Sequence, residues 1–462
     1  MNVTRRSFIG GSVACALTRG AFAAPDAAGV PAYSAEMAEA FAARVRARAE
    51  TCADGFFFIT DLHIPRNARR SGRIIAALAD RTPLRKVLCG GDLPEAFTRT
   101  GFTDRGSLED TVETYRTQWV EPLRTAGLKV YTAKGNHDFT IRRAPQSTEG
   151  LTFAEAETRR VVIGESTERD VVLNASDPTG CYYYFDNAAA KVRTIVADTT
   201  DSVRTDRAYW AVQYGQHAPQ LHWLAERALG TVPAGWFVVV MQHVPITSVV
   251  GSDEDVRNFA DMRHLLEAYQ NRTRVDLSGR RFDFSGAKGR ILLDLSGHQH
   301  TERSTWQRGI LHVTNPCDAA YQDYRYASLA CGELPPKKIG ERYEQTFDAV
   351  QFDLGRNLVH FTRFGGGTDR LYRLEPVKVR VGERLKIEPV LPGPVVGCGL
   401  VDADFAAVRK DPSRKYGTLY EFRSTYAEID ASAVVTARTP GESIAWLVHA
   451  DGLREFVPVV TR

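Results

Sequence analysis

Residues 55–63, GFFFITDLH, join a continuous apolar run to an Asp-x-His pair. An uninterrupted apolar run of this length is typical of a strand buried on both faces of an α/β sheet. Each of four further runs likewise leads into a polar group, and ligands in α/β sheets bind beyond the carboxyl ends of the strands. These runs are KVLCGG (86–91), LKVYTA (128–133), WFVVVMQ (236–242) and RILLDLSG (290–297). Together the five runs predict a sheet with a functional site at its edge.

Helical segments alternate with these strands, and further strands pair locally. Apolar residues recur at helical spacing in four segments, namely 33–50, 71–80, 108–127 and 218–230. YYYFDN (182–187) and KVRTIVAD (191–198) flank a small-residue turn and predict a hairpin. The expected sheet structure is therefore a mixture of parallel and antiparallel strands.

The chain changes character near residue 371, where the helical pattern ends. Short alternating strands separated by Pro and Gly turns then predict a small β-sandwich. The predicted fold class is thus α/β with a C-terminal all-β domain. We expect four segments: a leader at 1–24, an N-terminal helical segment at 25–51, a main domain at 52–370 and a β-rich domain at 371–462.

The first two dozen residues have the pattern of an export signal. TRRSF (4–8) is a twin-arginine pattern, and AFA (21–23) before Pro25 is typical of a cleavage site. We therefore expect the twin-arginine machinery as a partner and a periplasmic or otherwise exported protein. Minor alternatives are a chance Arg-Arg in a cytoplasmic protein and lipid anchoring at Cys15. No later run reaches about 18 apolar residues, so no transmembrane helix is expected.

Charge and cysteine spacing exclude several classes of partner and site. Without the leader the formal net charge falls from +3 to zero, because the leader carries three arginines and no acidic residue. No surface for nucleic acid or anionic lipid is therefore expected. The remaining six cysteines show no CxxC spacing, which argues against a zinc finger or a redox pair. Cys317 and Cys331 leave two alternatives open, a disulfide or two buried thiols.

Polar residues at the strand ends have the spacing and chemistry of a metal site. Asp61 and His63 are two residues apart, as are His298 and His300, and alternate side chains of an extended chain point the same way. Carboxylate, imidazole and amide donors without a thiolate suit Mn, Zn, Fe, Co or Ni. Two such ions about 3.5–4 Å apart can hold a bridging hydroxide and clamp a phosphoryl group.

The strand-end motifs, taken in order, resemble those of the calcineurin-like metallophosphoesterases over about residues 52–370. The motifs are Asp61-x-His63, Gly91-Asp92, Gly135-Asn136-His137-Asp138, His243 and Gly297-His298-x-His300. The resemblance implies two mixed sheets packed face to face with helices outside, a four-layer αββα sandwich.

The resemblance also implies a role for each residue of these motifs. The first metal ion would be held by Asp61, His63 and His300, and the second by Asn136, His243 and His298. Asp92 would bridge the two ions. His137 would face the leaving group, and Asp138 would orient His137.

The implied activity is hydrolysis of small-molecule phosphodiesters by a dinuclear metal centre through a bridging hydroxide, assisted by a catalytic histidine. Asp92 is followed by LPEA (93–96), without the tyrosine that purple acid phosphatases carry, and GNHD differs from the GNHE of calcineurin-type protein phosphatases. The sequence is therefore most similar to the bacterial phosphodiesterase branch. The alternatives are a phosphomonoesterase or nucleotidase using the same site and, less favoured, a non-catalytic periplasmic binding protein.

Other polar residues are interpreted as structural. Four histidines are assigned to helix surfaces, packing or strand interiors: His217, His222, His312 and His360. Three arginines after the first motif, Arg66, Arg69 and Arg70, are expected to form a solvated basic loop; the alternative is that one of them neutralises substrate phosphate.

Overall fold

The structure is a computed structural model. It describes residues 32–64, 70–93, 105–138, 155–201, 214–247, 259–318, 337–402, 407–410, 418–420 and 424–462. The predicted leader, Arg66, Arg69 and Cys331 lie outside these residues, so the expectations placed on them stay predictions.

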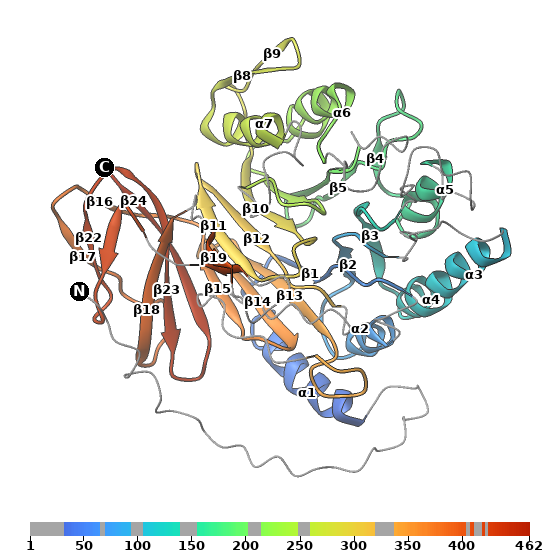
Figure 1. The fold of residues 1–462 in the computed structure, drawn as a ribbon, viewed down its shortest axis with the longest axis horizontal. Coiled ribbons are helices and arrows are strands. Elements are labelled where there is room, and N and C mark those ends of the chain that lie inside the picture. The colour runs from blue at the N-terminus through green and yellow to red at the C-terminus, as the bar shows by residue number, and fades with distance from the viewer. Residues whose placement is uncertain are drawn as a thin grey trace.

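Two large mixed sheets form the centre of the molecule (Figure 1). The first contains β1 (Asp54–Ile59), β2 (Lys86–Cys89), β3 (Lys129–Thr132), β13 (Thr346–Asp353), β14 (Leu358–Gly365), β15 (Arg370–Arg373), β16 (Val377–Val379), β18 (Val395–Asp402), β23 (Gly441–His449) and β24 (Arg454–Thr461). The second contains β4 (Val172–Leu173), β5 (Tyr183–Asn187), β6 (Val192–Val196), β7 (Phe237–Met241), β10 (Arg290–Ser296), β11 (Arg303–Gln307) and β12 (Ile310–Thr314). All five apolar runs predicted as strands are strands of these sheets.

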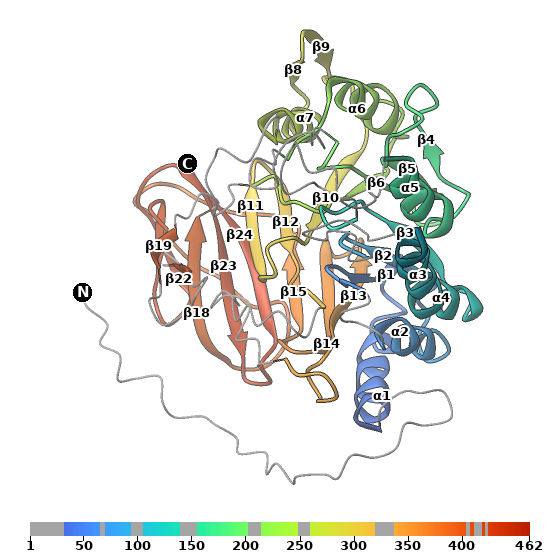
Figure 2. The ribbon, with the colours of Figure 1, turned by 45° about the vertical axis from the view of Figure 1, so that its right-hand side comes forward.

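Helices cover the outer faces of the two sheets (Figure 2). The α-helices are α1 (Ala32–Arg46), α2 (Ser71–Ala79), α3 (Arg105–Tyr115), α4 (Glu121–Thr125), α5 (Glu155–Arg159), α6 (Ala218–Trp223) and α7 (Phe259–Asn271). Short π-helical turns extend three of them: η1 (Arg116–Val120), η2 (Arg160–Glu165) and η4 (Leu224–Leu229). None of the described helices combines the length and apolar character needed to cross a membrane.

Three apolar cores lie between the layers, because strands buried on both faces alternate their side chains between two cores. Phe58 of β1 packs with Val239 of β7 and Leu293 of β10 in the core between the sheets. Phe57, the next residue along β1, faces the opposite way and packs in the core formed with α1 and α2. A third core joins the second sheet to α6 and α7. This layering confirms the predicted αββα architecture.

The parallel strands of both sheets end at the same place. β1, β2 and β3 run parallel to one another, as do β6, β7, β10 and β12. The predicted hairpin is present as antiparallel β5 and β6. The motifs identified in the sequence follow β1, β2, β3, β7 and β10, so the parallel strands carry them to one edge.

The predicted β-rich tail is confirmed, and its long strands extend the first sheet. β15 pairs in parallel with β24, which pairs with β23, which pairs with β18. The tail also forms a three-stranded sheet of β17 (Arg384–Lys386), β21 (Ala427–Ile429) and β22 (Val434–Ala437), which packs on this extension through Val435 and Leu447. Two hairpins stand apart: β8 (Arg274–Leu277) with β9 (Arg280–Asp283), and β19 (Ala407–Lys410) with β20 (Thr418–Tyr420). The expected boundary after residue 370 falls within β15, and the division into domains stays a prediction.

Candidate metal centre

Backbone hydrogen bonds tie together the loops that follow the parallel strands. The N–H of Asp61 donates to Gly91 O (3.0 Å), and the N–H of His63 donates to Asp92 O (2.9 Å). In the second sheet the N–H of Gly297 donates to His243 O (2.9 Å). The N–H of His298 donates to the Asp61 carboxylate (3.0 Å to Oδ2), which joins the two sheets. The loops therefore form one connected frame for the side chains they carry.

Four buried residues bring nitrogen and oxygen donors to one point. Asp61, His63, Asp92 and His300 each offer one such atom, and these atoms lie within 4.8 Å of one another. His300 Nε2 is 3.1 Å from Asp61 Oδ1 and 3.4 Å from His63 Nε2. This group consists of the three residues predicted for the first ion and the predicted bridging carboxylate.

The other three predicted ligands meet on the far side of Asp92. Asn136 Oδ1 is 3.0 Å from His243 Nε2 and 2.8 Å from His298 Nδ1. Asp92 Oδ2 lies 3.3 Å from His243 Nε2 and 3.8 Å from His63 Nε2. Asp92 thus lies between the two groups, and all seven predicted ligands come together.

His137 and Asp138 occupy different surroundings from the residues before them. The His137 ring lies edge-on to the His63 ring, with centroids 4.6 Å apart, and its backbone N–H donates to Asp92 Oδ1 (2.8 Å). The buried Asp138 carboxylate accepts hydrogen bonds from the backbone N–H groups of Leu93 (2.6 Å), Gly135 (2.7 Å) and Asp92 (3.1 Å). These bonds hold the β2 and β3 loops together. The predicted orientation of His137 by Asp138 stays a prediction.

The backbone explains how the Asp-x-His and His-x-His pairs converge, and the reason differs from the one expected. We predicted an extended chain, but five of the seven predicted ligands have positive φ: Asp61 (56°), His63 (50°), Asp92 (55°), His298 (67°) and His300 (54°). This left-handed conformation is uncommon for residues other than glycine. Such strain concentrates at functional sites, because the surrounding structure must hold it in place.

Two glycines permit the close approach of the loops. Gly91 has φ +98°, and a Cβ there would lie 2.8 Å from His243 Nδ1. A Cβ on Gly135 would lie 2.2 Å from Asp92 Oδ1. Any side chain at either position would therefore displace a predicted ligand.

In the centre, neighbouring charges outweigh burial in setting the pKa of Asp61, Asp92 and His243. Burial alone would raise the pKa of Asp61 and Asp92, yet the neighbouring imidazoles lower the first to about 2 and hold the second well below its usual value. Burial would also lower the pKa of His243, but Asp92 raises it to about 9. For His298, burial and then His243 lower the pKa to about 3. The two carboxylates thus stabilise positive charge within a buried site.

Divalent cations fit this donor set. A first-row ion such as zinc binds imidazole nitrogen at about 2.0–2.1 Å, so one ion can span two nitrogens 3.4 Å apart. The donors are imidazole, carboxylate and amide, without a thiolate, which suits Zn, Mn, Fe, Co or Ni. Of the seven donors, two are carboxylates and five are neutral groups. The two carboxylates supply the negative charge that buried cations require.

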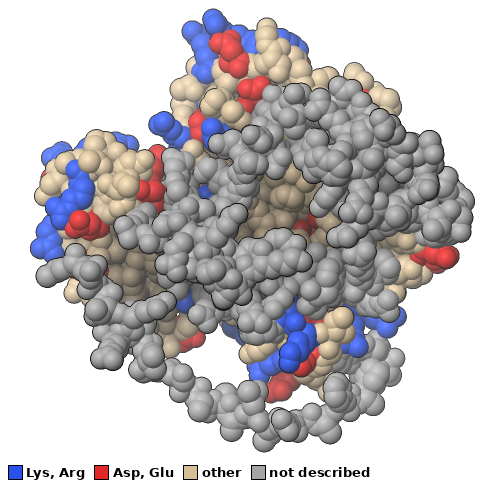
Figure 3. All heavy atoms as spheres, viewed as in Figure 1, with Lys and Arg blue, Asp and Glu red and all other residues tan. Residues whose placement is uncertain are grey.

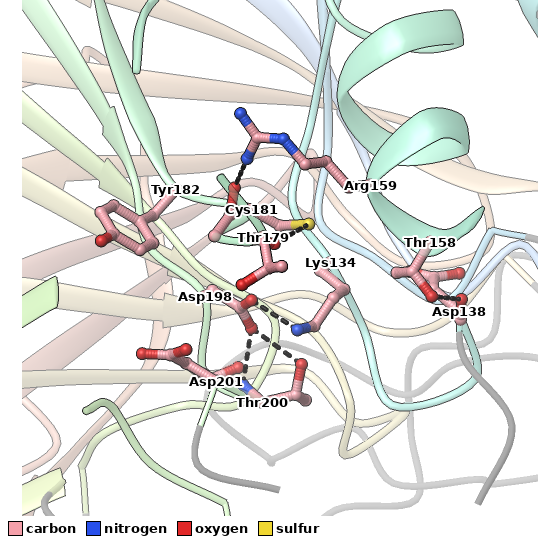
Figure 4. A network of polar contacts seen from close by, with 12 residues as sticks. Lys134, Asp138, Thr158, Arg159, Thr179, Cys181, Tyr182, Asp198, Thr200 and Asp201 are labelled. Carbon is pink, nitrogen blue, oxygen red and sulfur yellow. Dashed lines mark hydrogen bonds and ion pairs between the residues drawn. The ribbon is translucent and has the colours of Figure 1, made fainter. Parts of the chain in front are cut away.

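An ion pair that was not predicted from the sequence lies close to the loops that carry the second group of ligands. Lys134, two residues before Asn136, is largely enclosed, with its side chain 12% exposed, and places Nζ 2.5 Å from Asp198 Oδ2 (Figure 4). Asp198 follows β6, and its Oδ1 accepts hydrogen bonds from the N–H and hydroxyl of Thr200 (both 2.8 Å). The neighbouring Thr199 hydroxyl accepts the N–H of Val244, next to His243 (3.1 Å). These residues are far apart in sequence, so no local pattern could have paired them.

The described residues that were interpreted as structural lie away from the centre, and most of them have partners there. His217 precedes the first residue of α6 and places Nδ1 3.5 Å from Asp201 Oδ1, and His222 Nε2 lies 3.1 Å from Leu277 O. His312 pairs with Asp294 (2.8 Å) within the second sheet, and His360 lies in β14. Arg70 donates to Glu344 (2.8 Å).

Several solved structures are similar to parts of this chain at low identity. A dimetal phosphatase from Danio rerio is 12% identical, covering 69% of this chain and 98% of its own, with a TM-score of 0.42. A purple acid phosphatase from yellow lupin seeds is 12% identical, covering 68% and 53%, with a TM-score of 0.40. A putative 5′-nucleotidase from Staphylococcus aureus is 13% identical, covering 68% and 53%, with a TM-score of 0.34. Nothing about the substrate follows from likenesses this distant.

Sequence comparison gives a firmer result. No curated protein matches the chain. A family model described as calcineurin-like phosphoesterase matches residues 56–302, which is more than half of the chain and includes every predicted ligand. The chain belongs to the calcineurin-like phosphoesterase family and is a metallophosphoesterase, a hydrolase of phosphoester bonds.

Proposed function

We propose that this metallophosphoesterase uses two divalent ions and acts preferentially on phosphodiesters. The observation that carries the proposal is the convergence of seven donors in two groups on either side of Asp92. The preference for diesters rests on the motif pattern, which is most similar to the phosphodiesterase branch of the family.

Each residue of the centre has a definite task in this proposal. Asp61, His63 and His300 would hold one ion, whereas Asn136, His243 and His298 would hold the other, and Asp92 would contact both. Bound ions would supply Lewis-acid chemistry, polarising the phosphoryl group and making water a stronger nucleophile near neutral pH. Asp92 would also fix the position of His137, since it accepts the His137 N–H.

His137 would act on the leaving group. Its side chain is only half-buried, while His63, whose ring it meets edge-on, is fully buried, so part of the His137 side chain is accessible to a substrate. A protonated imidazole can donate a proton to the departing alcohol oxygen, a contribution of about 10²–10⁴-fold in rate. The alcohol then leaves without developing an uncompensated negative charge.

The test compares bis(p-nitrophenyl) phosphate with p-nitrophenyl phosphate on protein reconstituted separately with Mn, Zn, Fe, Co or Ni. We expect a higher kcat/KM for the diester and a fall in kcat of about 10²–10⁴-fold in His137→Ala with metal content unchanged. His264→Ala, an exposed histidine on α7, is the matched control and should retain full activity. Preference for the monoester would reassign the chain as a phosphomonoesterase, and no turnover above His137→Ala would exclude catalysis.

Export by the twin-arginine route is part of the same proposal and rests on TRRSF (4–8). Replacing both arginines, Arg5→Lys and Arg6→Lys, should retain the protein in the cytoplasm of a bacterial host with that route. Cell fractionation measures this, and unchanged periplasmic recovery of the double variant would rule the route out.

A further inference from the structure

A cavity of about 750 Å³ lies between the helical side of the second sheet and the C-terminal strands. α7 and β8 form one wall, and the ends of β16, β23 and β24 form the other. Arg290, at the start of β10, also lines the cavity. His298 follows the opposite end of the same seven-residue strand, so about 20 Å of strand separates the cavity from the metal centre.

Basic side chains predominate in this cavity. Its lining holds five Lys or Arg side chains and three Asp or Glu side chains. Figure 3 shows Lys and Arg atoms on the β8–β9 hairpin at the top and on the C-terminal strands at the left, on the two sides of the cavity. The excess of positive charge would attract an anion.

The basic and the acidic residues of the cavity differ in whether they have interaction partners. Of the five basic residues, Arg274 pairs with Asp283. Within the described part of the chain, Arg462 has no carboxylate partner within ion-pair distance, nor do the three cations that matter most here, Arg290, Arg308 and Lys378. Of the acids, Glu267 pairs with Arg263 on its own helix, and Asp276 pairs with Arg281. Glu442 accepts the backbone N–H of Arg308. The acids are therefore occupied, while the three cations keep their charge available.

Arg290 is the most informative of the three. Its guanidinium is half-buried, and burial lowers its pKa despite the opposing effect of Glu375. It donates to two neutral oxygens, Asn357 Oδ1 (3.2 Å) and Leu374 O. Removing a guanidinium from water without an anionic partner is costly, and an anion in the cavity would offset that cost through charge-assisted hydrogen bonds.

The C-terminal end of α7 offers a partial alternative explanation. A helix C-terminus favours nearby cations, so some basic residues would be stabilising there without a ligand. However, the three cations come from β10, the β11–β12 turn and β16, and none belongs to α7. We infer that this cavity is a binding site for a small multivalent anion carrying two or more phosphate, sulfonate or carboxylate groups, separate from the metal centre.

The probe is 1,5-naphthalenedisulfonate, a divalent anion that the enzyme cannot hydrolyse and that chelates metals poorly. Titration calorimetry on the full metal-loaded chain should show saturable binding that weakens with salt, and benzenesulfonate should bind at least tenfold more weakly. The double variant Arg308→Gln/Lys378→Gln should raise the Kd for the disulfonate at least tenfold. Both residues are exposed, so the fold should be retained.

The matched control removes the same charge elsewhere. The control is Arg384→Gln/Arg438→Gln. Arg384 lies in β17 and Arg438 directly follows β22, both pair with acids outside the cavity, and the double variant should leave the Kd unchanged. The disulfonate should not inhibit hydrolysis of p-nitrophenyl phosphate. An equal loss of binding in both double variants, competitive inhibition of hydrolysis, or no saturable binding would each overturn the proposal.

Discussion

At the scale of single residues, the motifs identified the donors, whereas their convergence depends on backbone conformation. Asp61-x-His63 and His298-x-His300 were correctly read as pairs, but the expected extended chain is wrong because all four residues have positive φ. Sequence periodicity predicts strands and helices. It does not predict isolated left-handed residues that only tertiary contacts can hold.

Gly135→Ala tests how tightly the loops enclose Asp92. The added Cβ would lie 2.2 Å from Asp92 Oδ1 and 2.3 Å from Asp92 N, so the predicted bridging carboxylate must move. Misplacement of about 1 Å can cost 10²-fold in rate, so we expect kcat/KM to fall by roughly that factor and metal retention after dialysis to drop.

Gly164→Ala is the control for this change. Gly164 lies in the π-helical turn η2, where a Cβ would meet no atom within 4 Å, so the substitution should leave activity intact. Full activity and metal content in Gly135→Ala would contradict the assigned role of Asp92.

At the scale of elements, the sequence predicted the buried strands best. Runs such as 56–59 and 237–241 are apolar throughout because both faces of these strands are covered. α7 and the β8–β9 hairpin were not predicted, although Met262, Leu265, Leu266 and Tyr269 follow helical spacing. The hairpin turns at Ser278-Gly279, both with positive φ, but its strands are largely exposed and show little apolar alternation.

The Lys134–Asp198 pair links a strand of one sheet to a strand of the other. Lys134→Met should therefore lower the free energy of unfolding. Lys134 follows β3, Asp198 follows β6, and their side chains are 12% and 1% exposed. Removing one partner of a buried pair leaves the other charge uncompensated and typically costs about 3–5 kcal/mol of unfolding free energy. Denaturant unfolding measures this loss.

The double variant Lys134→Met/Asp198→Asn separates charge from packing. Because no uncompensated carboxylate remains, it should recover a substantial part of the lost stability. A double variant no more stable than Lys134→Met would show that packing of the Lys134 side chain, rather than its charge, stabilises the β3 loop.

At the scale of the whole molecule, the first sheet runs without a break from β3 to the C-terminal strands. The Tyr372 ring of β15 stacks on Phe456 of β24 at 4.7 Å between centroids. Phe456 and Trp446 belong to the same core as Phe58 and Leu293, the core that lies between the two sheets and beneath the metal centre. The tail therefore shares its apolar core with the phosphoesterase fold.

Phe456→Ala tests whether this shared core makes the molecule unfold as one unit. Truncating a fully buried phenylalanine costs about 3–5 kcal/mol, and the loss should appear in the whole structure. Thermal unfolding followed by circular dichroism and by residual phosphoesterase activity should therefore show one transition, with both midpoints lowered equally. Val396→Ala, exposed on β18 in the same tail, should change stability by no more than about 0.5 kcal/mol. If Phe456→Ala lowered only one of two separate transitions and left the activity midpoint unchanged, the tail would be an independent folding unit despite the continuous sheet.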